Sequence, residues 1–168
     1  MRKIILFTAL AAISLASCKK SNVAPSNTFS ATIDGTTESF NTNVSAQNGT
    51  GTALNSDLSV FGYNGSASGA DVLTITLNTN SKITTGTYSN AASSNNGFVS
   101  ILYQKGPQSL ASPNVYASHV NGNYLTTVKI TSISNTDVQG TFSAQLVYTD
   151  GKTIKTVTDG KFNVAIKQ

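Results

Sequence analysis

From Phe29 onward, apolar and polar residues alternate with a period of two, and many of the apolar residues are β-branched or aromatic. Strands that bury one face have this pattern, whereas no window here has the spacing of an amphipathic helix longer than a turn or two. The pattern predicts strands over residues 58–63, 72–78, 98–103, 115–118 and 124–133. In two of these strands we expect the inward residues to be Leu73, Ile75 and Leu77, and Tyr124, Val128 and Ile130.

Seven Asn-Gly or Asp-Gly dipeptides punctuate these runs. Both residue types tolerate the positive φ angles that tight hairpins require. The first such hairpin has Asp34-Gly35 as a two-residue loop, which pairs Phe29 with Phe40 on one face.

The C-terminal residues predict a three-stranded meander. Residues 142–148 alternate, and three-residue loops at 149–151 and 158–160 would return the chain twice. In this register Leu146, Ile154 and Val164 share one row, and a slip of one residue would turn them toward water.

Together these elements predict an all-β fold of about nine or ten strands, in an antiparallel β-sandwich or a partly open barrel that ends in the meander. Short connections favour antiparallel pairing, because parallel neighbours need long crossovers. A single domain is expected over residues 29–168, since one core suffices for this length. The polar segments 41–57 and 89–97 are interpreted as surface loops.

The N-terminus has the features of an export signal. Arg2 and Lys3 precede an apolar run over residues 4–15, and small residues follow. Twelve residues rise only about 18 Å as a helix, which is too short for a hydrocarbon core of about 30 Å. We therefore expect residues 1–17 to be a signal peptide and residues 18–28 to be a flexible tether.

The segment Leu15-Ala16-Ser17-Cys18 resembles the bacterial lipobox. This resemblance implies cleavage before Cys18 and lipidation of that cysteine, so that acyl chains attach the protein to a membrane. Lys19 and Lys20 follow, and the aspartate that retains many lipoproteins in the inner membrane is missing. The outer membrane is the expected location, with the periplasmic and cell-surface sides both open.

The formal charge of +4 and the pI of about 9.2 are properties of the precursor. Residues 21–168 carry seven Lys against seven Asp and Glu, a net charge of zero. No basic stripe remains for a nucleic acid partner.

Residues that could carry out chemistry are few. The single Cys excludes an internal disulfide and a Cys-based zinc site, and no cofactor or other metal site is indicated. His119 is the only side chain that titrates near neutral pH without tuning, and a polar residue at a strand end is its simpler interpretation. No Gly-x-Ser-x-Gly elbow and no distinctive carboxylate pair is present, so we do not expect an enzyme. A calcium site in the Asn-rich loops is left open.

Tyrosines are the candidate ligand-binding residues. Their rings could stack on sugars while Asn and Thr side chains bind sugar hydroxyls, and ordinary sheet packing is the alternative. The candidates are Tyr63, Tyr88, Tyr103 and Tyr116.

Several segments resemble a family of uncharacterised Bacteroidota lipoproteins. Besides the lipobox, these are residues 29–35, 86–88, 140–142 and 157–164. Phe40 stands where that family often has Trp. The resemblance implies a lipid-anchored β domain and no established activity.

The expected function is therefore that of a cell-envelope lipoprotein whose β domain is a non-catalytic binding or interaction module. Its partners would be the membrane, through Cys18, and a glycan or an envelope protein. Two alternatives remain, a glycan-binding outer-membrane lipoprotein that uses exposed Tyr and Asn or Thr, and a structural envelope protein. A monomer is expected.

Overall fold

The computed structural model describes residues 26–49, 56–66, 69–91, 97–106, 114–118 and 124–167. The predicted signal segment, Cys18 and His119 lie outside these residues. Within them the chain forms eleven strands and no helix, and nothing there could cross a membrane as an apolar helix. The strands are β1 (Thr28–Ile33), β2 (Thr36–Ser39), β3 (Thr42–Asn48), β4 (Asp57–Asn64), β5 (Asp71–Asn78), β6 (Gly86–Ser89), β7 (Phe98–Gln104), β8 (Val115–Ser118), β9 (Thr126–Ile133), β10 (Asp137–Tyr148) and β11 (Ile154–Lys167).

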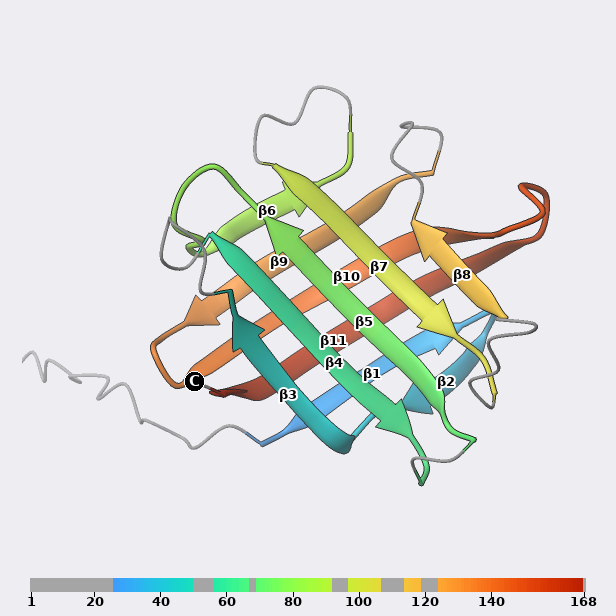
Figure 1. Ribbon diagram of the computed structural model, residues 1–168, viewed down its shortest axis with the longest axis horizontal. Helices are drawn as coiled ribbons and strands as arrows, with labels where there is room; N and C mark the ends of the chain where they lie inside the picture. Colours follow the sequence, from blue (N-terminus) through green and yellow to red (C-terminus); the bar gives the residue numbers. More distant parts are fainter. Residues whose placement is uncertain are drawn as a thin grey trace, which may run out of the picture.

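The strands form two layers that cross at a large angle (Figure 1). One layer runs β3-β4-β5-β7-β8, and the other runs β2-β1-β11-β10-β9-β6. The layers join at two corners, where β11 pairs with β3 and β10 pairs with β8. Crossed layers linked at their corners define an orthogonal β-sandwich. The all-β class is confirmed. A three-stranded meander is present as β9-β10-β11, but it is not the predicted one, because the two strands expected after residue 148 are the single strand β11. The strands pair antiparallel except β11 and β3, which are parallel.

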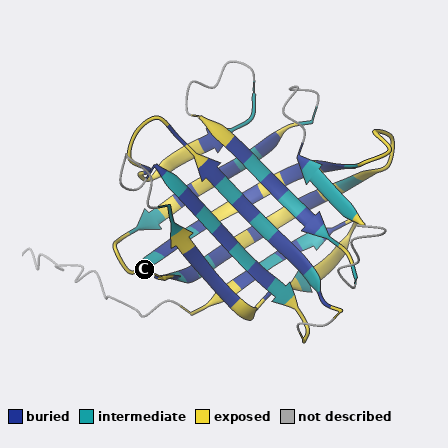
Figure 2. Ribbon diagram, in the orientation of Figure 1, coloured by how far each residue is buried: buried dark blue, intermediate teal, exposed yellow. Residues whose placement is uncertain are grey.

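Burial alternates along the strands as the sequence pattern requires (Figure 2). Leu73, Ile75 and Leu77 are at most 1% exposed, and Val128 and Ile130 are equally buried. The prediction for Tyr124 was wrong, because β9 begins at Thr126, which takes the inward position ahead of Val128.

The first hairpin has the predicted register. Asp34 and Gly35 have φ angles of 49° and 83°, as a tight two-residue turn needs. Phe29 and Phe40 consequently lie side by side with ring centroids 5.8 Å apart, and neither ring is exposed.

The predicted register of the C-terminal hairpin was wrong. Leu146 pairs with Lys155, and Ile154 pairs with Val147 on the outer side, where Ile154 is 43% exposed. The reason is a four-residue loop over residues 149–152, which Asp150 closes by accepting hydrogen bonds from the backbone N–H groups of Lys152 and Thr153 at 2.8 Å each.

The second predicted loop of the meander, at Asp159-Gly160, is a bulge inside β11 rather than a turn. Asp159 has a φ of 51°, and the register shifts by one residue opposite Ser143. A single extra residue re-aims a strand without ending it, so β11 continues to Lys167.

Two polar segments also differ from the loops that were predicted. Residues 41–57 contain β3, whose Val44 and Ala46 are buried against the core, and Ser89 ends β6. β3 has only two apolar residues, so its sequence resembles that of a polar loop, and its pairing with β4 makes it a strand.

Candidate functional site

One row of aromatic side chains runs through the core and ends at the rim of the sandwich. Neighbouring ring centroids are 5.2 to 6.3 Å apart along the row. The rings, in order, are Phe162, Phe142, Phe29, Phe40, Tyr103, Tyr116 and Tyr148.

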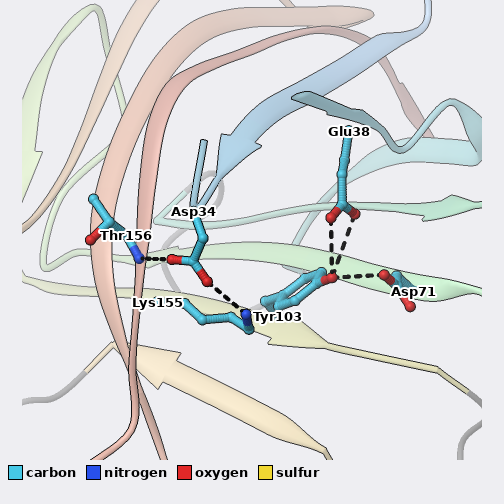
Figure 3. Close-up of polar contacts among 6 residues, drawn as sticks. All are labelled: Asp34, Glu38, Asp71, Tyr103, Lys155 and Thr156. Atoms are coloured by element: carbon cyan, nitrogen blue, oxygen red, sulfur yellow. Dashed lines mark hydrogen bonds and ion pairs between the residues drawn. The ribbon is translucent and has the colours of Figure 1, made fainter. Parts of the chain in front are cut away.

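Tyr103, near the end of β7, is 1% exposed, and its hydroxyl meets two carboxylates (Figure 3). It lies 2.7 Å from Asp71 Oδ2 at the start of β5, and 3.4 and 3.5 Å from the two oxygens of Glu38 on β2. A phenol has one proton to donate, so the short bond to Asp71 takes it. Burial, then the hydrogen bond to Asp71 and the Glu38 charge, raises the pKa of Tyr103 far above its usual range.

The two carboxylates are held to different degrees. Asp71 also accepts a 2.6 Å hydrogen bond from the backbone N–H of Gly106. Glu38 has only long contacts in the described structure, from Tyr103 and from the Asn64 side-chain amide at 3.3 Å. Normal hydrogen bonds to a carboxylate are about 2.5–2.9 Å long, so the acceptor capacity of Glu38 is poorly used.

A second pair lies beside this centre. Lys155 Nζ is 2.8 Å from Asp34 Oδ2, and Asp34 Oδ1 accepts the Thr156 N–H at 2.9 Å (Figure 3). Burial opposes ionisation of Asp34, but the hydrogen bonds from Lys155 and Thr156 outweigh it and lower the pKa of this carboxyl. Lys155 Nζ also lies 5.0 Å from the centroid of the Tyr116 ring, within cation–π range.

The predicted tyrosines are dispersed. Tyr103 and Tyr116 lie together, with centroids 6.3 Å apart, and Tyr148 joins them at 5.2 Å from Tyr116. Tyr88 is 8% exposed, and its hydroxyl exchanges hydrogen bonds with the backbone of Thr84. Burial removes the ring faces of Tyr88 and Tyr103 from solvent, which corrects their assignment as stacking residues.

Gly62 on β4 pairs with Leu73, and Leu73 pairs with Tyr103, so these three residues form one inward-facing row. Successive residues of a strand point to opposite faces, so Tyr63 is half-buried on the outer face of β4. It is therefore on the opposite side of the layer from Tyr103. Tyr63 and Tyr116 are the predicted ligand residues that retain some exposed ring surface.

Sequence reasoning missed the acidic members of the site. Glu38 and Asp71 are 65 and 32 residues from Tyr103, and Asp34 is 121 residues from Lys155. Asp34 was recognised only as a turn residue. No local spacing could bring these groups together, since strand pairing alone does so.

The described residues contain no group of three or more His, Cys, Asp or Glu side chains placed to hold a metal ion. Calcium binding in the Asn-rich loops stays a prediction, because residues 50–55 and 92–96 lie outside the described chain. Comparison with family models, curated proteins and solved structures finds no match.

Proposed function

We propose that this chain is a lipid-anchored envelope protein whose β domain binds a polyhydroxylated ligand, a glycan, at the rim formed by Glu38, Asp71, Tyr116 and Tyr148. The observation that carries the proposal is the Glu38 carboxylate, whose contacts of 3.3 to 3.5 Å leave it able to accept stronger hydrogen bonds. A pair of sugar hydroxyls supplies such donors, and the half-buried Tyr116 and Tyr148 rings lie nearby for stacking.

The same geometry favours binding over glycosidic hydrolysis. A glycosidase needs two carboxylates with the scissile bond between them. Here the buried phenol of Tyr103 fills the space between Glu38 and Asp71. The carboxylates can therefore hold a ligand at the rim but cannot flank one.

The start of β1 and the rim lie at opposite ends of this strand. Ser26 precedes β1, whereas Asp34 follows its last residue and is paired with Lys155, whose Nζ lies 5.0 Å from the centroid of the Tyr116 ring in the rim. A tether from Cys18 to Ser26 spans at most about 29 Å when fully extended. A lipid on Cys18 would thus keep the domain close to the bilayer, with the rim on the end of β1 that points away from the tether.

Glycan binding is tested by calorimetry on the full chain with a panel of neutral oligosaccharides. Glu38→Gln should weaken the binding of any hit about tenfold, because it removes a charged acceptor. Asp137→Asn, at the first residue of β10, is the matched control and should bind normally. No binding across the panel, or equal loss in both variants, contradicts the proposal.

Anchoring is tested separately by metabolic labelling with radioactive palmitate. The wild-type protein should carry the label and Cys18→Ser should lose it. A label that persists in the variant, or is absent from the wild type, excludes lipidation at this cysteine.

A further inference from the structure

A second feature lies on the outer face of the β6-β9-β10-β11 layer, away from the rim. Thr141 on β10 pairs with Lys129 on β9 and with Lys161 on β11, and Thr87 on β6 pairs with Lys129. Cross-strand partners project from the same face, so the two lysines flank Thr141 in one row. Strands are about 4.8 Å apart, which places the two lysine Cα atoms roughly 10 Å from each other.

Long side chains beside short ones make this face concave. Across the four strands the row reads Thr87, Lys129, Thr141 and Lys161, so Thr141 lies between the lysines and Thr87 lies on the other side of Lys129. Thr127 and Ser143 form the neighbouring row, and together these residues line a hollow of about 370 Å³. The hydroxyl residues are Thr87, Thr127, Thr141 and Ser143.

The hollow carries a net positive charge. Lys129 and Lys161 have no ion pair among the described residues, in contrast to Lys155, which is paired with Asp34. Asp159 is the single carboxylate among the lining residues. It occupies the bulge of β11, so backbone geometry accounts for its presence there.

We propose that this hollow binds an acidic polysaccharide, with sugar carboxylates at Lys129 and Lys161 and sugar hydroxyls at the threonine and serine floor. Two ammonium groups that form no ion pair within the described part of the chain match the repeated charge of a polyuronate. A hydroxyl-lined concavity fits a sugar ring better than it fits a flat bilayer. The inference extends the proposed glycan-binding function but uses a different face, different residues and a different ligand charge.

The test measures binding of polygalacturonate to the full chain in detergent, with neutral dextran for comparison. Lys129→Gln and Lys161→Gln should each weaken polygalacturonate binding roughly threefold, and together roughly tenfold, as expected for exposed ion pairs. Asp159→Asn should strengthen binding, because it removes a repelling charge while asparagine tolerates the positive φ. Lys152→Gln, in the exposed loop after β10, is the matched control and should change nothing.

Added salt should weaken wild-type binding more than that of the double variant, because fewer charges are screened in the variant. Absence of polygalacturonate binding, or variants that all bind alike, overturns the inference. Binding to anionic phosphatidylglycerol vesicles without binding to polygalacturonate overturns it as well, in favour of a membrane surface. The rim site is measured with neutral oligosaccharides, and this hollow with polygalacturonate and the Lys129 and Lys161 variants, so the two sites can fail independently.

Discussion

The two ends of the aromatic row are stabilised in different ways. At the inner end Phe142 pairs with Gly160 and Phe162 pairs with Gly140, so each ring covers a residue that lacks a side chain. A Cβ on Gly160 would lie 2.6 Å from the Phe142 ring, and one on Gly140 would lie 2.4 Å from Phe162. At the rim end the hydroxyl of Tyr103 donates a hydrogen bond to Asp71, and Glu38 lies 3.4 Å from the same oxygen.

The inner end is thus stabilised by close packing of rings, and the rim end by hydrogen bonds to charged groups. Close packing at Phe142 and Gly160 does not depend on pH and tolerates no added atom. The Tyr103 end depends on which groups are ionised, and it is the end that offers unused acceptors to a ligand. Stability resides chiefly at the inner end, and the proposed binding chemistry at the rim.

The largest effect is expected at the inner end. Phe142→Ala should lower the free energy of unfolding by about 3–5 kcal/mol, since it removes a buried ring that contacts both Phe29 and Phe162. Urea denaturation followed by circular dichroism measures the loss. A loss below 1 kcal/mol would mean that the ring is not part of a close-packed core.

A double mutant then tests whether shape is the cause. Gly160→Ala should cost about 1–3 kcal/mol, because its methyl group overlaps the Phe142 ring. In a Phe142→Ala background the same change should cost much less, because the ring is gone. Strict additivity of the two costs would contradict the shape argument.

At the rim, Tyr103→Phe should cost about 1.5–3 kcal/mol, because it deletes a hydrogen bond to the half-buried carboxylate of Asp71. Tyr88→Phe is the matched control at a neutral backbone partner, and its cost should be nearer 1 kcal/mol. Equal costs in the two variants would show that charge adds nothing at Tyr103.

Alkaline pH sharpens the same comparison. The pKa of Tyr103 is raised in the folded state, so above pH 10 the unfolded chain loses this proton while the folded chain keeps it. This contribution to stability is complete below pH 10 and should decline as the pH rises further. Denaturation midpoints at pH 9 to 11 should therefore fall more steeply for the wild type than for Tyr103→Phe.

The smallest effect is expected at the Asp34–Lys155 pair. The lowered pKa of Asp34 stabilises the fold above pH 3.8, and this contribution should be lost as the pH falls through the folded-state value. Water screens the pair, since the Asp34 side chain is 45% exposed, so Asp34→Asn should cost about 0.5 kcal/mol at pH 7. The cost should vanish near pH 2, and a cost that persists there would point to backbone strain instead.

The local sequence pattern predicted the strand register correctly where the register depends only on one strand and the turn next to it. Asp34-Gly35 fixed the register of Phe29 against Phe40, because a two-residue loop allows only one pairing. The local pattern gave a wrong prediction at Asp159-Gly160. The same kind of dipeptide forms a bulge there, because β1 and β10 pair with β11 on both sides and keep the chain extended. The local pattern also gave a wrong register for Ile154. Asp150 accepts hydrogen bonds from the N–H groups of Lys152 and Thr153 and so forms a four-residue loop, which the Asp-Gly dipeptide alone does not predict.

The sequence by itself determined that this chain folds as β-sheet, which residues face inward on most strands, and where the first hairpin turns. Those features depend on side-chain periodicity and on φ preferences, both of which are local. Only the tertiary structure decided the crossing of the layers, the parallel β11–β3 contact and the meeting of Glu38, Asp71 and Tyr103. These depend on the packing of strands distant in the chain, which the local pattern of residues does not reveal.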